Sequence, residues 1–160
     1  MQRILIQAIL NRIAAELPQF KTVDLFNDQF NKADAGKSNP IRFPALFVSF
    51  PEGAQYADLS AGLQETEDLT VRFYISQGMT NETVGKTILE VMDLKQVVYS
   101  KFQGYGSDYI KTFHRINEEA DEERTSYYVF IQDYSTAVID ISKYIQEGET
   151  VTLTLDLTEE

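Results

Sequence analysis

The segment of this sequence with the clearest potential for chemistry is Gly78–Thr87, which ends in Gly85-Lys86-Thr87 like a phosphate-binding loop. Such a loop needs four residues between its two glycines so that backbone amides can surround the phosphates. Here six residues separate the glycines, and Thr80 stands where the first glycine belongs. Thr80 or Asn81 is also a good helix cap. We therefore predict an ordinary helix start and no nucleotide site.

His114 is the only histidine, and the chain has no cysteine. Disulfides, thiolate metal sites and cysteine nucleophiles are therefore excluded. Neither a paired-histidine metal spacing nor a nucleophile-elbow motif is present. His114 alternates with Phe113, which indicates one face of a strand. We predict no catalytic residue, no cofactor-binding residue and no metal site.

Two groups of carboxylates remain, namely Glu65, Glu67 and Asp68, and Glu118, Glu119, Asp121, Glu122 and Glu123. Paired carboxylates can perform acid–base chemistry or bind Mg²⁺ or Ca²⁺. The second group lacks the glycine and ligand spacing of a calcium loop. A solvated hairpin turn is the favoured interpretation. A further interpretation is that these acidic residues face an electronegative lumen.

The composition describes an acidic globular chain. Of its 160 residues 43% are hydrophobic, with 9 Tyr and 10 Phe, which suits one folded domain, 1–160. The net charge is −11, so most of the surface repels nucleic acid and anionic membranes. We find no signal peptide and no membrane span, and we expect the protein to start in the cytoplasm.

The hydrophobic pattern of the first half predicts a helix and three strands. Residues 2–17 form the helix, which ends at Pro18. Residues 22–26 are a short strand, 27–40 a loop, 43–50 a buried strand and 52–64 another loop. The clearest strand follows, with Leu69, Val71, Phe73 and Ile75 on one face. The apolar face of the helix comprises Ile6, Ile9, Leu10, Ile13 and Leu17.

The second half predicts a central helix that runs to about Phe102, two strands at 109–117 and 124–134, and an acidic turn at 118–123. The apolar stripe of the helix comprises Val84, Ile88, Val91, Met92 or Lys95, and Val98. Residues 135–149 are ambiguous. The chain closes with an edge strand in which Val151, Leu153, Leu155 and Leu157 alternate with polar residues. That strand either completes the subunit's own sheet or pairs with a neighbouring subunit.

The predicted fold class is α+β, a mostly antiparallel β-sheet with an N-terminal helix and a central helix packed on one face. Residues from about 135 to 160 form a C-terminal extension with the edge strand. The order of an opening helix, the strand Phe43–Val48, the strand Leu69–Ile75, a long helix and the strand Tyr127–Phe130 resembles the tail terminator, or tail completion, proteins of tailed phages. The resemblance covers roughly residues 1–134.

The resemblance implies a structural virion protein, not an enzyme, that uses no cofactor. Such a subunit forms a ring, commonly a hexamer, on the tail tube protein, and it contacts the sheath protein and the head connector. DNA passes through the ring without specific binding. The implied location is the tail or neck of the virion, after assembly in the bacterial host cytoplasm. Head-completion and neck adaptor proteins share similar folds, and a monomeric peptide-binding module and a small hydrolase remain alternatives.

Overall fold

The computed structural model describes residues 2–36, 40–59, 62–78, 84–122 and 127–141. The helices are α1 (Gln2–Glu16), α2 (Gln29–Asp34) and α3 (Val84–Phe102). The strands are β1 (Thr22–Leu25), β2 (Ala45–Ser49), β3 (Tyr56–Asp58), β4 (Gln64–Thr66), β5 (Leu69–Gly78), β6 (His114–Asp121), β7 (Tyr127–Thr136) and β8 (Ile139–Asp140).

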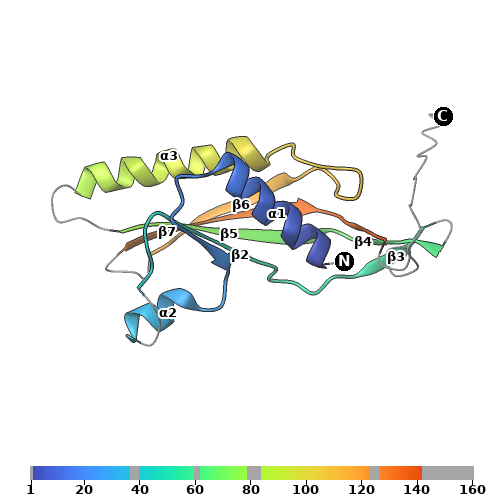
Figure 1. The fold of residues 1–160 in the computed structure, drawn as a ribbon, viewed down its shortest axis with the longest axis horizontal. Coiled ribbons are helices and arrows are strands. Elements are labelled where there is room, and N and C mark those ends of the chain that lie inside the picture. Colours follow the sequence, from blue (N-terminus) through green and yellow to red (C-terminus); the bar gives the residue numbers. More distant parts are fainter. Residues whose placement is uncertain (1, 37–39, 60–61, 79–83, 123–126, 142–160) are drawn as a thin grey trace.

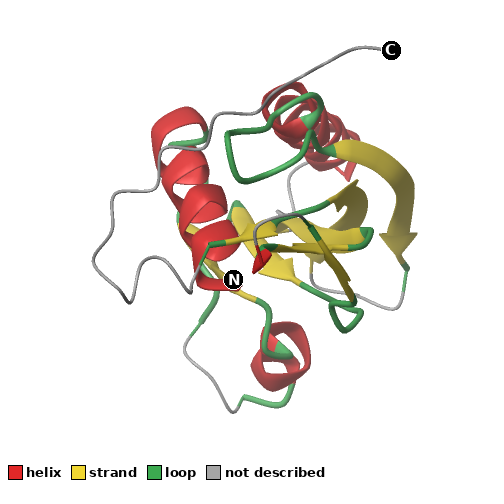
Figure 2. Ribbon diagram, turned by 90° about the vertical axis from the view of Figure 1, so that its right-hand side faces the viewer, coloured by secondary structure: helices red, strands yellow, loops and turns green. Residues whose placement is uncertain are grey.

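A five-stranded sheet in the order β1-β2-β5-β7-β6 forms the centre of the molecule. All its neighbouring strands are antiparallel except the β1–β2 pair. Helices α1 and α3 lie on one face of this sheet, and α2 lies on the other (Figure 1). The view in Figure 2 shows the same separation of the helices. The predicted fold class is therefore confirmed, with α2 as an additional helix.

Strand β5 is central because its side chains alternate between the two faces of the sheet. Val71, Phe73 and Ile75 are fully buried beneath α1 and α3, as the alternation predicts. On the same face Leu46 and Val48 of β2 belong to this main core. The core also contains Leu5, Ile9 and Ile13 of α1, Leu17 directly after this helix, and Val98 and Phe102 of α3. Burial of these apolar surfaces is the main source of the fold's stability.

A second, aromatic core lies on the opposite face of the sheet, under α2. Phe30 is its centre, and its ring meets Phe47 edge to face at a centroid distance of 5.3 Å. Phe26 stacks on Tyr74 at 4.0 Å. The Tyr127 hydroxyl donates a hydrogen bond to the Phe30 carbonyl oxygen at 3.0 Å. These contacts explain why a segment with little helical patterning nevertheless folds as a helix.

Several predicted boundaries are wrong. Helix α2 occupies part of the predicted loop 27–40, and β3 and β4 occupy parts of the predicted loop 52–64. These two strands form a small second sheet with β8, in the order β3-β4-β8. The strand predicted from 109 begins only at His114, because Ile110 and Phe113 are core residues of the preceding loop.

The helix faces also differ in part from the prediction. In α1, Leu5 is fully buried, whereas Ile6 and Leu10 are only half-buried. In α3, the buried side is made by Thr87, Val91, Val98 and Phe102. Ile88, which was predicted in the apolar stripe, is 38% exposed, and Met92, predicted there as an alternative to Lys95, is 43% exposed. They therefore lie on the flank of the helix, outside the core.

Candidate functional site

The phosphate-loop-like segment lies at the junction of β5 and α3. Gly78 is the last residue of β5, and α3 begins at Val84, so Gly85, Lys86 and Thr87 fall in its first turn. Thr80 and Asn81, the predicted caps, lie outside the described residues. Thr87 is buried, so its hydroxyl does not face an open phosphate cradle. The prediction of an ordinary helix start agrees with this placement.

His114 and the first carboxylate group border a groove of about 860 Å³ between the small sheet, the loop before β6 and the end of β7. Lys111 and Glu65 form an ion pair there at 2.8 Å. The Thr66 hydroxyl accepts a hydrogen bond from the Val138 amide at 2.8 Å. Within the described residues, no cluster of three His, Cys, Asp or Glu side chains could hold a metal ion. The groove thus offers mixed polar contacts.

The two predicted acidic groups are not brought together. Glu67 and Asp68 are exposed in the turn that precedes β5. Because β6 pairs with β7 as far as Asp121 opposite Val129, the second group lies toward the other end of the sheet. The prediction of a turn at 118–123 is partly wrong, since Glu118, Glu119 and Asp121 belong to β6. Glu122 follows the strand, and Glu123 lies outside the described residues.

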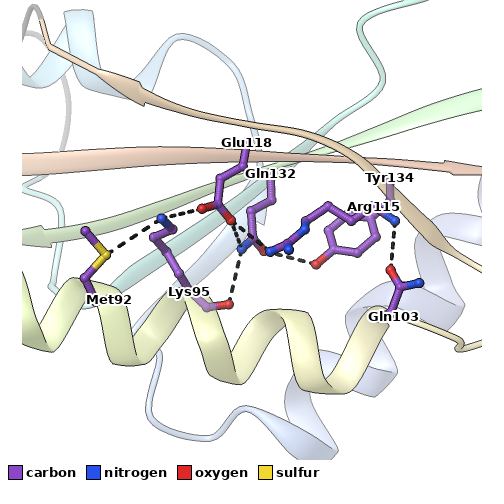
Figure 3. A network of polar contacts seen from close by, with 7 residues as sticks. All are labelled: Met92, Lys95, Gln103, Arg115, Glu118, Gln132 and Tyr134. Atoms are coloured by element: carbon purple, nitrogen blue, oxygen red, sulfur yellow. Dashed lines mark hydrogen bonds and ion pairs between the residues drawn. The ribbon is translucent and has the colours of Figure 1, made fainter.

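Glu118 is the centre of a polar network that fastens α3 to β6 and β7 (Figure 3). Its carboxylate accepts hydrogen bonds from Lys95 at 2.5 Å, Gln132 at 2.8 Å and Arg115 at 3.0 Å. Gln132 also accepts a hydrogen bond from the Tyr134 hydroxyl at 3.1 Å. Burial raises the pKa of Glu118, but the hydrogen bonds from Lys95 and Gln132 outweigh it and hold that pKa below its ordinary value. Glu118 is therefore a structural carboxylate with two cationic partners.

The two outer strands of the large sheet are candidate interaction sites. In the part of the chain that the structure describes, β1 has β2 as its one neighbour, and β6 has β7. Seven of the eight residues of β6 are exposed, and Ile116 in its bulge is 58% exposed. Val23 and Leu25 of β1 are 36% and 37% exposed. An unpaired strand edge is a template for pairing with another chain.

Sequence reasoning missed both edges, because neither strand has a strict apolar–polar alternation with a buried face. The predicted intersubunit strand, Val151, Leu153, Leu155 and Leu157, lies outside the described residues. Among the described helices, none has the length and apolar character needed to cross a membrane. No protein-family model matches the chain, and a search of curated proteins finds no match.

Proposed function

We propose that this chain is a structural assembly protein, a ring-forming tail terminator that caps the tail tube of a phage or phage-derived particle and joins the tail to the head connector. The proposal rests on the element order, in which an opening helix and a long central helix cover one face of a mostly antiparallel sheet. It assigns the chain no catalytic residue, no cofactor and a place in the virion.

The main observation behind the proposal is that the two edges of the large sheet are formed by different strands. Strand β1 closes one side and β6 the other, and each has one neighbour within the described residues. A subunit with two different edges can bind its neighbours head to tail, and such contacts give a ring when the rotation closes. A ring subunit requires two unlike surfaces that fit each other, and two unlike edges can supply them.

The charge of the chain supports a further part of the proposal, which is that DNA passes through the ring. The net charge is −11, and Glu67, Asp68 and Glu119 are exposed carboxylates. Carboxylates repel the phosphates of DNA over about 8 Å at physiological ionic strength. An acidic lumen would therefore let DNA slide without binding.

The long exposed edge of β6 also favours a second candidate, a monomeric module that captures an extended peptide by strand addition. A head-completion or neck adaptor protein of the same fold group is a further alternative. Deleting the gene should have different effects on particle assembly for each of these alternatives than for a terminator.

Deletion of the gene in the particle that encodes it tests the proposal, with the wild-type gene supplied in trans as the control. Tail tubes of uncontrolled length, or tails that do not join heads, are expected in electron micrographs. Tails of normal length beside heads that lose their DNA would assign the chain to head completion instead. Normal-length tails joined to full heads would overturn the proposal.

A further inference from the structure

We infer that neighbouring copies of this chain join through unlike edges, with β1 of one copy beside β6 of the next. This inference rests on the proposed function, since it names the contact that would close the ring. Four observations on the described residues support it. They concern the apolar residues at β1, the apolar residues at the β6 edge, the face of the sheet over which both lie, and the charges of β6.

At the β1 edge, two apolar side chains extend the face of the sheet that carries α1 and α3. Val23 pairs in register with Leu46, and Leu25 pairs with Val48. Leu46 and Val48 are buried in the main core beneath the helices, whereas Val23 and Leu25 remain 36% and 37% exposed. The helix layer of this subunit therefore stops short of its own outermost strand.

At the β6 edge, the helix layer is apolar on its outer flank. Lys95 and Tyr99 of α3 contact Glu118 and Arg115 of β6, so this flank of the helix faces β6. Ile88 and Met92 lie on the same flank, two turns and one turn before Lys95. They are 38% and 43% exposed. Ile116 of β6 adds a third exposed apolar side chain at this edge.

Val23 and Leu25 on one side, and the flank of α3 with Ile88 and Met92 on the other, thus lie over the same face of one sheet. If β1 of one copy continues the sheet beyond β6 of another, Val23 and Leu25 come beside the flank of α3 that carries Ile88 and Met92. One contact then buries both groups. A symmetric contact, β1 with β1 or β6 with β6, would bury one group and leave the other in water.

The charges of β6 disfavour a symmetric contact. Strand β6 contains one arginine and three carboxylates. Lys95 and Arg115 hold Glu118, whereas Glu119 and Asp121 stand opposite Ile131 and Val129 and so share the face that carries α2. Like charges destabilise cross-strand pairs, so β6 is a poor partner for a second β6.

The absence of cysteine permits a direct test by cross-linking. We would mix Val23→Cys protein with Ile116→Cys protein at high concentration and add a short bifunctional thiol reagent. The mixture should give a covalent dimer that neither variant gives alone, and the double variant should give a ladder of higher species. Gln64→Cys, an exposed position on β4 away from both edges, replaces Val23→Cys in the matched control and should give no dimer with Ile116→Cys.

Circular dichroism and the melting temperature of each variant confirm that it is folded, which is expected because Val23, Ile116 and Gln64 are exposed.

Failure of the inference is distinguishable from failure of the proposed function. A covalent dimer from Val23→Cys alone or Ile116→Cys alone, or no dimer in the mixture, overturns the β1–β6 contact. A ring seen by native mass spectrometry without that cross-link refutes this contact and leaves the terminator proposal standing. The cross-link together with normal tails in the deletion strain refutes the terminator proposal and leaves the contact standing.

Discussion

Arg72 and Asp133 stand directly opposite each other on β5 and β7 and form a two-pronged ion pair. Arg72 Nε lies 2.7 Å from one carboxylate oxygen of Asp133, and a terminal guanidinium nitrogen lies 2.8 Å from the other. Asp133 is 5% exposed. Its hydrogen bonds raise the pKa of Arg72 above the ordinary value. The pair therefore joins the two central strands on the face that carries α2.

Asp133→Ala should lower the free energy of unfolding by about 3 kcal/mol, because it leaves a partly buried guanidinium without its partner. Urea denaturation at neutral pH measures this. Lys111→Ala is the matched control, since its ion pair with Glu65 involves a lysine side chain that is 63% exposed. That variant should lose less than about 1 kcal/mol. Equal losses in the two variants would contradict the structural importance of the Arg72–Asp133 pair.

Phe73→Ala should lower the free energy of unfolding by about 3–5 kcal/mol, because the removed ring leaves a cavity in the main core. Phe73 is fully buried, with ring centroids 4.5 Å from Phe102 and 5.5 Å from Tyr134. Ile116→Ala, at an exposed position of β6, should change the free energy of unfolding by less than about 0.5 kcal/mol. A loss below about 1 kcal/mol for Phe73→Ala would show that this face of β5 is not the core.

Glu118 should make the free energy of unfolding depend on pH in the acidic range. Its pKa is lower in the folded than in the unfolded chain, so it stabilises the fold above its ordinary pKa of 4.5, and this contribution is lost as the pH falls through the folded value. Glu118→Gln should be less stable than the wild type at neutral pH and should lose less stability below pH 4.5. Melting temperatures across this range measure the difference. Glu119→Gln, on the opposite face of β6, is the control and should retain the wild-type acid dependence.

Ser76→Ala should not destabilise the protein and is expected to stabilise it by about 1 kcal/mol. The Ser76 hydroxyl is fully buried on β5, and within the described part of the chain its oxygen has no hydrogen-bond partner. Removing a buried polar group that makes no hydrogen bond removes a desolvation cost. A clear loss of stability in thermal denaturation would indicate that this hydroxyl has a partner in the folded protein.

The sequence predicted best those elements whose pattern reflects burial on one face. Strand β5 alternates regularly, and α3 has a long apolar stripe, so both were located well. Helix α2 was missed because Phe30 is its one buried side chain, and three-residue strands such as β3 are too short for any periodicity. Strand β6 was misplaced because tertiary packing buries Ile110 and Phe113 in the preceding loop.

The candidate site was less predictable than the fold. Strands β1 and β6 are edge strands because each has a neighbouring strand on one side only among the described residues. Strand order is a property of the fold, and the sequence of β6 does not reveal that its outer side has no neighbour among the described residues. The same holds for Ile88 and Met92, whose spacing is typical of a buried helix face. In the structure Val91 and Val98 of α3 are fully buried, and the side that carries Lys95 and Tyr99 contacts β6.

Strand β2 gives the two cores a shared support. Leu46 and Val48 enter the main core, whereas Ala45 and Phe47 enter the aromatic core on the other side of the same four residues. Because side chains alternate along a strand, sliding β2 by one residue would send each set into the wrong core. Neither core can loosen at β2 without disturbing the other. The two layers of the domain are therefore coupled into one cooperative unit, although they share no helix.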